Sequence, residues 1–457
     1  MNQSPQPRPP RGVFRGHENP IRPPEDSELT HVGLGTPCGE YWRRFWFPVA
    51  MTQEVTDLPL RIRILGEDLV LFRDGSGRYG LLHMHCSHRN TSLEFGLIEE
   101  RGISCCYHGW HYDIDGTILA TPGDPESGVR EHVRHGTYPV IEYEGLVFAY
   151  MGPSAEMPQF PVFDTFELPG GDLVPYSISM PCNWLQVAEN TTDPIHVAFL
   201  HSRKRDIHFA DTWGDVRLIQ WFEGEWKMNV AASLRLGDMV WVAIQEIVYP
   251  ANGSVTYLWE DGTEEKYFTR LGLSKWSVPI DDTHCMVIGW RHFGDIDVRR
   301  MGRREMIGKQ SLDFPGQTGT EPYSERQRDP NDFEATVGQG PISSHAAENL
   351  VVHDTGVAML RRRLREGIRA VQSGEHVSMP GQDGSTPYCY AQSTVLPISP
   401  KPGRDDDQML LEIGKAVYDT VASGDAYSEP ERTEKIRDAL RELPQDLRFS
   451  GSGTRAH

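Results

Sequence analysis

Short apolar runs separated by glycine-containing turns fill the first third of the chain. Apolar and polar residues alternate at 61–64, and the apolar run at 69–72 leads into the segment Asp74-Gly75-Ser76-Gly77. Asp115-Gly116 marks a second tight turn between two short strand-like runs. An alternation of period two, broken by Asp-Gly turns, is typical of antiparallel hairpins. The pattern therefore predicts a small antiparallel β domain over residues 29–155.

The rest of the chain mixes strand-like and helical patterns. A proline-rich joint at 153–175 follows the β domain, and strand-like runs such as 240–244 lie beyond it. Apolar residues recur on one helical face from about 343 to 374, and shorter helical patterns lie near 407–422 and 430–443. We therefore expect an α+β protein with four parts, which are an N-terminal arm (1–28), the β domain (29–155), a larger mixed domain (156–400) and an acidic helical tail (401–457).

Composition narrows the class of protein. The chain has 457 residues, enough for two or three domains, and a formal charge of −20, which argues against a general nucleic-acid partner. No apolar run reaches the roughly eighteen residues of a membrane span, and the N-terminus lacks the apolar stretch of a secretory signal. Seven cysteines, an odd number, favour a reducing compartment over a disulfide framework. We expect a cytoplasmic protein without a membrane partner.

Two short loops carry cysteine and histidine at matching spacings. Cys86 and His88 form a C-x-H pair, and after sixteen intervening residues Cys105 and His108 form a C-x-x-H pair. A [2Fe–2S] cluster with two thiolates on one iron and two imidazoles on the other needs this ligand set. One structural zinc ion also accepts two cysteines and two histidines, so spacing alone leaves both interpretations open. Cys106, beside Cys105, is expected to pack rather than to bind metal.

A second constellation follows the segment Asn183-Trp184-Leu185-Gln186. It contains Asn190, Asp193, His196 and His201, and the two histidines are five positions apart. A distorted or π-type turn would direct both imidazoles at one metal. Two neutral imidazoles and one carboxylate leave open positions on Fe(II) for dioxygen. Asp193 precedes His196 by about one helical turn and would accept a hydrogen bond from a ligand N–H, so Asp193 and Asn190 are candidate catalytic residues.

Together these two segments resemble a known family. The segments 86–110 and 183–201 resemble the α subunit of Rieske non-haem iron aromatic-ring oxygenases, and the resemblance extends over roughly residues 30–375. The entry segment, with Gly35-Thr36-Pro37 and an aromatic run at 43–48, is similar to the phthalate-dioxygenase-like branch, which includes aromatic O-demethylases. The resemblance implies a Rieske domain joined to a helix-grip catalytic domain with an antiparallel sheet and flanking helices.

The resemblance also identifies a carboxylate for the second metal. The segment Asn331-Asp332-Phe333-Glu334-Ala335, followed by 338–342, looks like the branch's iron-binding motif, in which the Asp binds iron. This implies Asp332 as the third ligand beside His196 and His201. Glu334 and Asp354 remain chemical competitors, because any nearby carboxylate completes such a triad.

Cofactors and partners follow from the same resemblance. It implies a [2Fe–2S] Rieske cluster on Cys86, His88, Cys105 and His108, a mononuclear Fe(II), and electrons from a separate NAD(P)H reductase, with or without a ferredoxin. It also implies a homotrimer or a dimer of trimers that acts with O₂ on a small aromatic substrate. In the family, electrons pass from the cluster of one chain to the iron of the next through an Asp that matches Asp193.

The reaction itself is less defined by the sequence. O-demethylation or hydroxylation of a carboxylated, methoxylated aromatic compound is the expected activity, and ring cis-dihydroxylation of an aromatic acid such as phthalate is the alternative. An electron carrier without oxygenase activity and a zinc-stabilised binding module are the other classes. A substrate carboxylate favours a buried arginine, for which Arg203, Arg205 and above all Arg235 are the candidates.

Overall fold

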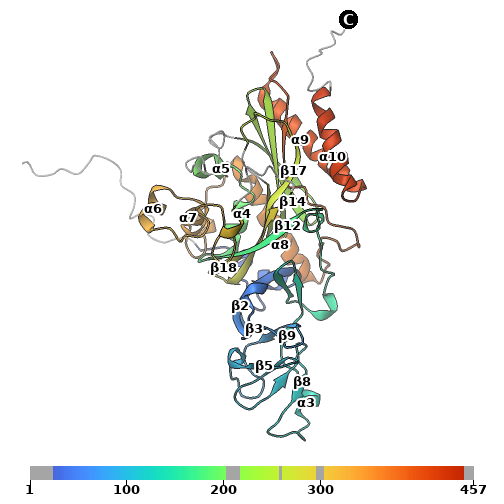
Figure 1. The fold of residues 1–457 in the computed structure, drawn as a ribbon. Coiled ribbons are helices and arrows are strands. Elements are labelled where there is room, and N and C mark those ends of the chain that lie inside the picture. The colour runs from blue at the N-terminus through green and yellow to red at the C-terminus, as the bar shows by residue number, and fades with distance from the viewer. Residues whose placement is uncertain (1–23, 202–216, 257–259, 295–302, 447–457) are drawn as a thin grey trace, which may run out of the picture.

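The computed structural model describes residues 24–201, 217–256, 260–294 and 303–446. Figure 1 shows three small sheets at one end and a large sheet with most of the helices at the other. All strand pairs within the named sheets are antiparallel. The α+β class predicted from the sequence is confirmed, while the domain boundaries stay a prediction.

The small sheets come from residues 46–150, as the alternation predicts. Their strand orders are β1-β11-β10, β2-β3-β4-β9 and β5-β6-β7-β8. Gly116 has φ +78°, which favours glycine, and it forms the turn between β7 and β8. The strands are β1 (Trp46–Met51), β2 (Leu60–Ile64), β3 (Glu67–Arg73), β4 (Tyr79–His83), β5 (Leu97–Ile98), β6 (Ile103–Ser104), β7 (His111–Tyr112), β8 (Ile118–Ala120), β9 (Thr137–Tyr138), β10 (Val140–Tyr143) and β11 (Leu146–Tyr150).

The large sheet has the order β12-β18-β17-β16-β15-β14-β13, and β19 pairs with β15 and β17. Its strands are β12 (Asp172–Met180), β13 (Leu218–Glu223), β14 (Lys227–Leu236), β15 (Met239–Val248), β16 (Asn252–Thr256), β17 (Lys266–Asp281), β18 (His284–Phe293) and β19 (Gln392–Leu396). A single hydrophobic core spans both parts of the molecule, and it contains the buried Trp42, Trp184, Trp276 and Trp290. Because this core is shared, the small sheets are packed against the large one.

The helices are α1 (Ser27–Thr30), α2 (Pro37–Trp42), α3 (Val129–His132), α4 (Trp184–Asn190), α5 (Ile195–Leu200), α6 (Tyr323–Arg328), α7 (Asp332–Val337), α8 (Thr355–Ser373), α9 (Asp406–Ser423) and α10 (Glu431–Glu442). None in the described part of the chain is long and apolar enough to cross a membrane. Part of the predicted N-terminal arm is docked, since the Asp26 carboxylate pairs with Arg365 of α8.

The long helix α8 begins later than its apolar pattern predicts. We expected a helix from about 343, whereas α8 starts at Thr355 and residues before it form short turns. Leu350, which fits the apolar face, is 47% exposed. Polar contacts hold this segment instead, because Glu348 pairs with Arg361 of α8 and the backbone N–H of Ser343 donates to Gln186.

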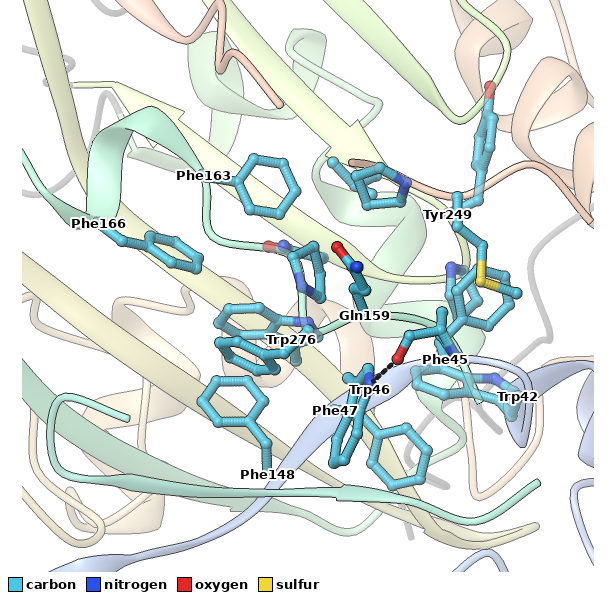
Figure 2. Close-up of a pocket in the computed structure, with 18 residues that line it drawn as sticks. Trp42, Phe45, Trp46, Phe47, Phe148, Gln159, Phe163, Phe166, Tyr249 and Trp276 are labelled. Carbon is cyan, nitrogen blue, oxygen red and sulfur yellow. Dashed lines mark hydrogen bonds between the residues drawn. The ribbon is translucent and has the colours of Figure 1, made fainter. Parts of the chain in front are cut away.

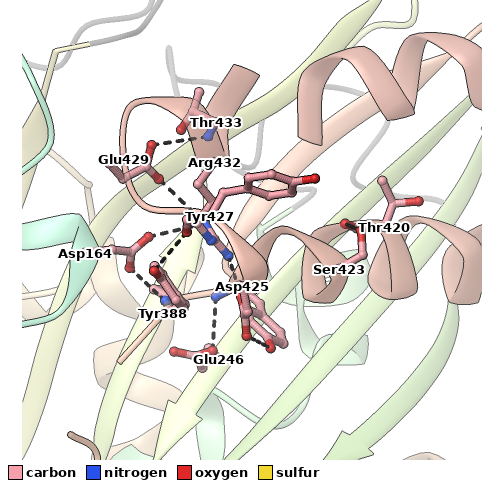
Figure 3. A network of polar contacts seen from close by, with 12 residues as sticks. Asp164, Glu246, Tyr388, Thr420, Ser423, Asp425, Tyr427, Glu429, Arg432 and Thr433 are labelled. Carbon is pink, nitrogen blue, oxygen red and sulfur yellow. Dashed lines mark hydrogen bonds and ion pairs between the residues drawn. The ribbon is translucent and has the colours of Figure 1, made fainter. Parts of the chain in front are cut away.

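The two C-terminal helices lie where the sequence predicts them, and they pack on the sheet. Apolar residues of α9 and α10 form a second core with β14, β15 and β17. A buried network fixes this arrangement (Figure 3). In it the Asp164 carboxylate contacts Arg432 of α10 and Arg270 of β17, and Glu429 contacts both guanidinium groups. The tail is therefore held against the mixed domain by apolar packing and by ion pairs.

Candidate metal centres and their cavity

The two cysteine–histidine loops lie side by side at the tips of the small sheets. Cys86 and Cys105 are buried, and the Cys86 Sγ lies 3.0 Å from the Tyr112 hydroxyl. The rings of His88 and His108 are 4.6 Å apart, and His88 is exposed. The two thiols are therefore buried, and the imidazoles are exposed at His88 and half-buried at His108, which suits a cluster with two thiolates on one iron and two imidazoles on the other. Cys106 is exposed, contrary to its expected packing, because it lies in the turn between β6 and β7.

The geometry of these loops differs from that of a single-ion site. Among the described residues, the one group of three or more His, Cys, Asp or Glu side chains whose ligand atoms lie within 4.8 Å of one another is His196, His201 and Asp332. Ligands of a tetrahedral zinc ion converge on one point at about 2.0–2.3 Å. The loop cysteines and histidines do not converge in this way, so their arrangement fits a two-iron cluster better than zinc.

Local structure explains how the second constellation forms. The Asn183 side chain caps α4 by accepting the N–H of Leu185, and its amide also donates to the carbonyls of Thr30 and Asp282. Asn190 is the last residue of α4, and α5 starts after the turn that contains Asp193. The capped α4 therefore holds Asn190 in place.

The two histidines converge through the first of the two predicted alternatives, a distorted helix end rather than a π-type turn, because His201 lies in a 3₁₀ turn directly after α5. His196 lies in α5, and His201 follows its last residue with an α-helical hydrogen bond from its N–H to the Val197 carbonyl. Five positions apart, the two side chains leave an α-helix about 140° apart. Their ring centroids lie 5.2 Å apart because the rings turn toward a third group, the Asp332 carboxylate.

Asp332 supplies that third group. Its Oδ1 lies 3.6 Å from His196 Nε2 and 3.4 Å from His201 Nε2. Asp332 is the first residue of α7, and this helix starts with a capping box in which Asn331 accepts the Asp332 N–H. Two imidazole nitrogens and one carboxylate oxygen at these separations fit the facial set of an Fe(II) that keeps open positions.

The electrostatics of the site favour a cation. Burial would raise the pKa of the Asp332 carboxyl, but the charges of His201 and His196 hold it well below its usual range. Burial would likewise lower the pKa of His196, but the Asp193 hydrogen bond and the Asp332 charge raise it above its usual value. Ionised Asp193 and Asp332 therefore flank His196, and a divalent ion would be stabilised there.

Further groups surround the ligand set. His196 Nδ1 lies 3.7 Å from Asp193 Oδ2, while Asp193 Oδ1 accepts the N–H of Ile195. The Asn190 amide lies 3.2 Å from Asp332 Oδ1, and Gln317 donates to Asp332 Oδ2 at 2.7 Å. Such outer contacts fix the orientation of ligands. Gln317 was not identified from the sequence, because no motif surrounds it and its segment carries no regular period.

The competing carboxylates have other partners. Glu334 accepts the Asn331 N–H in the capping box and pairs with Arg326. Asp354 accepts the N–H of Val351 just before α8. The structure thus brings Asp332, and neither competitor, to the two histidines.

The predicted substrate arginine lies elsewhere. Arg235 is on β14, and its guanidinium binds the Asp406 carboxylate of α9 and the carbonyl of Ile398. It is not among the residues that line the cavities beside Asp332, whereas Lys275 is. Arg203 and Arg205 lie outside the described residues.

A cavity opens beside His196, His201 and Asp332. Its apolar wall consists of Val197, Val255, Leu273, Leu312 and Phe314, and its polar wall of Asn190, Thr191, Gln245, Lys275 and Gln317. An apolar lining with a few polar groups is typical of sites that bind small organic molecules.

A second pocket lies at the junction of the two parts. It is lined mainly by aromatic residues, including Trp46, Phe148, Phe163 and Trp276 (Figure 2). Neighbouring side chains of a strand point to opposite faces of a sheet. Trp276 lines this pocket while Lys275 lines the cavity beside Asp332, so the two hollows lie on opposite faces of β17.

Known proteins with similar sequences agree with this geometry. Residues 45–139 match the Rieske [2Fe-2S] domain. The oxygenase subunit of tert-butanol monooxygenase/tert-amyl alcohol desaturase of Aquincola tertiaricarbonis is 42% identical over 421 residues, which cover 87% of this chain and 88% of that protein. The chain belongs to the α subunits of the Rieske oxygenases. It is therefore an oxygenase component that holds a [2Fe–2S] cluster and a mononuclear iron, and the zinc-module and electron-carrier hypotheses are set aside.

Other Rieske oxygenases show the breadth of the family. The α subunit of phenoxybenzoate dioxygenase of Ectopseudomonas oleovorans is 38% identical over 367 residues, or 76% of this chain and 86% of that protein. The oxygenase subunit of 5,5'-dehydrodivanillate O-demethylase of Sphingobium sp. is 31% identical over 370 residues, or 77% and 81%. Dicamba monooxygenase with non-haem iron and dicamba shares the fold, with a TM-score of 0.52, 14% identity and coverage of 73% and 98%.

The names of these relatives also bear on the electron supply. They are called oxygenase subunits, so each is named as one component of a larger enzyme. The predicted need for a separate reductase agrees with this.

Proposed function

We propose that this Rieske oxygenase hydroxylates a saturated carbon next to oxygen, and that its substrate is a methoxylated aromatic acid that it O-demethylates. The supporting observation is the cavity that joins His196, His201 and Asp332 to an apolar wall and a cationic side chain. When bound, the cluster supplies single electrons and the iron activates dioxygen. The protein's own residues position the substrate and shield the reacting carbon from water.

The reaction balances with two electrons. One oxygen atom enters the methyl C–H bond, and the other leaves as water with two electrons and two protons. The resulting hemiacetal breaks its C–O bond to give a phenol and formaldehyde. The 31% identical O-demethylase supports this outcome, and the 42% identical tert-butanol monooxygenase supports alkyl hydroxylation more generally.

A second candidate is ring cis-dihydroxylation. The 38% identity to the α subunit of phenoxybenzoate dioxygenase favours it. It consumes the same number of electrons but places both oxygen atoms in the ring and releases no formaldehyde. The products therefore separate the two reactions.

Single-turnover product analysis tests the reaction. Protein reduced by dithionite and freed of reductant is mixed with oxygen and 3-methoxybenzoate, phthalate or tert-butanol in parallel. We expect one formaldehyde for each oxygen consumed with 3-methoxybenzoate. A cis-diol without formaldehyde would establish the dihydroxylase candidate instead, and hydroxylation of tert-butanol alone would replace the aromatic substrate with a tertiary alcohol.

We further propose that electrons cross between chains of a trimer. Figure 1 shows the small sheets that carry the cluster loops at one end of the molecule, while α5 and α7 lie on the flank of the large-sheet part. His88 is exposed, and the Asp193 side chain is 29% exposed beside His196. A neighbouring chain's cluster loops would therefore be able to reach Asp193. The seven free cysteines support the proposed cytoplasmic location.

Mixed oligomers test this arrangement. A His108→Ala chain retains the iron site, and an Asp332→Ala chain retains the cluster. Each variant alone is expected to be inactive, and oligomers assembled from both are expected to regain part of the activity. Mixed oligomers that stay inactive would place electron transfer within one chain.

A further inference from the structure

One cationic side chain in the cavity beside Asp332 has no structural role within the described part of the chain. Two neighbouring cavities have Asp332 in their walls, and Lys275 of β17 lines both of them. Within the described part of the chain its ammonium forms no hydrogen bond and no ion pair. Burial lowers the pKa of Lys275, and the Asp332 charge offsets this only in part. A partly buried charge without an ion-pair partner does not stabilise a fold, so such a residue needs another explanation.

The strands on both sides of Lys275 leave space around it. Its register partners are Gly253 on β16 and Gly289 on β18. A Cβ at position 253 would lie 3.1 Å from Thr191 Oγ1 and 3.6 Å from Lys275 Cε, and one at 289 would collide with the Ser274 carbonyl at 2.0 Å. Side chains are therefore missing on both sides of the lysine stem, which leaves its end open to the cavity.

Other polar side chains of this cavity already have partners at the iron site. Asn190 and Gln317 both contact Asp332 and so serve the iron site. Asp332 itself is committed to the two histidines. Lys275 is therefore the cationic group of this cavity that an incoming anion would meet, among the residues that the structure describes.

We propose that Lys275 anchors the carboxylate of an aromatic acid and thereby directs the methoxy group of the molecule toward His196, His201 and Asp332. This inference rests on the proposed function and assigns to Lys275 the role that the sequence suggested for Arg235. An ammonium–carboxylate pair in a cavity of mixed polarity is a strong, charge-assisted contact. It would select acids over neutral molecules of the same shape.

Two probes of matched shape test the assignment, 3-methoxybenzoate and the neutral 3-methoxybenzyl alcohol. Dissociation constants are measured by equilibrium dialysis with the iron-loaded protein, and KM by oxygen uptake. The variants are Lys275→Met, which keeps the length of the side chain, and Lys275→Arg, which keeps its charge. Lys415→Met, at an exposed position on α9, is the matched control.

We expect Lys275→Met to weaken binding of the acid by about ten- to hundredfold and to change binding of the alcohol less than about twofold. Lys275→Arg should keep a preference for the acid, and Lys415→Met should behave as wild type. Because an unpartnered charge is removed, Lys275→Met should also unfold at the same temperature as wild type or higher.

Three results would overturn the assignment. These are a wild type that binds both probes equally, a Met variant that binds the acid normally, and a Met variant that loses both probes to the same extent. Failure of the proposed O-demethylation is recognised separately, as acid binding without formaldehyde. The dialysis comparison then still decides the role of Lys275.

Discussion

Gln317 donates a 2.7 Å hydrogen bond to Asp332 Oδ2, the carboxylate oxygen opposite the one that faces the two histidines. The contact leaves Oδ1 as the oxygen directed at the metal position. It also ties α7 to the segment between β18 and α6, which contributes Leu312 and Phe314 to the cavity. Ligand orientation and cavity wall are thus linked through one amide.

Removing this amide should weaken the iron site. In Gln317→Leu the Asp332 carboxylate loses its orienting donor, and we expect iron affinity to fall about ten- to hundredfold. Iron content after dialysis against a graded chelator measures this effect, while the visible spectrum of the cluster should stay unchanged. Gln408→Leu, at an exposed position on α9, is the control. Wild-type iron retention in Gln317→Leu would show that the hydrogen bond does not orient the ligand.

The sequence predicts both ligand sets, because their residues belong to short motifs whose members lie close together along the chain. Cys86, His88, Cys105 and His108 lie in two tight loops, and His196 and His201 lie in and directly after one short helix, α5. Gln317 and Lys275 could not be identified in the same way. Lys275 becomes distinctive only when β16 and β18 place Gly253 and Gly289 beside it, and such pairings are not encoded in spacing along the chain.

The cluster loops offer a separate test. His108→Ala removes one imidazole from the outer iron, so the Rieske-type signal of the reduced protein should disappear. The iron at His196, His201 and Asp332 should remain, because no contact links that site to His108 within the described chain. Electron paramagnetic resonance and metal analysis measure both. A colourless wild type with stoichiometric zinc would contradict the cluster assignment.

The choice among carboxylates is also testable. Asp332→Ala should remove iron from the second site and leave the cluster spectrum intact, because it deletes one of three ligands. Asp354→Ala should keep iron, since Asp354 accepts the N–H of Val351 and lies 3.8 Å from His353 Nε2, away from the two histidine ligands. Its expected cost is a modest loss of stability of about 1 kcal/mol, because the Val351 N–H at the start of the short turn before α8 loses its acceptor. The opposite pattern of iron loss would make Asp354 the ligand.

Asp193 should matter for electron transfer rather than for metal binding. Asp193→Asn keeps size and removes the charge that lies 3.7 Å from His196 Nδ1. Both metals should stay bound, and oxidation of the reduced cluster in a single turnover should slow by about tenfold or more. Stopped-flow absorbance measures this rate. An unchanged rate would remove Asp193 from the path between chains.

The secondary structure could be predicted where it follows from the local alternation of apolar and polar residues. It could not be predicted where polar contacts between distant residues override that pattern. The hairpins of the small sheets follow from alternation and Asp-Gly turns. The start of α8 did not, because the pairing of Glu348 with Arg361 holds the preceding segment in turns that no period reveals. The role suggested for Arg235 also failed to find support, since its partner Asp406 lies far along the chain.

A buried histidine of the large sheet, on the face opposite Lys275, predicts that the free energy of unfolding depends on pH. His292 of β18 bonds to the Ser274 hydroxyl at 2.9 Å, and burial, with the charges of Arg291 and Arg270, lowers its pKa to about 3. An unfolded chain has a histidine pKa of about 6.5. Between these values the unfolded state takes up a proton that the folded state does not, so stability is fully present above pH 6.5 and falls as the pH drops toward 3, by about 1.4 kcal/mol per unit. Thermal midpoints of wild type and His292→Gln at pH 7.5 and 5.5 measure this effect. The thermal midpoint should fall less in the variant than in wild type between pH 7.5 and pH 5.5. An equal fall in both proteins would show that His292 is not the group responsible.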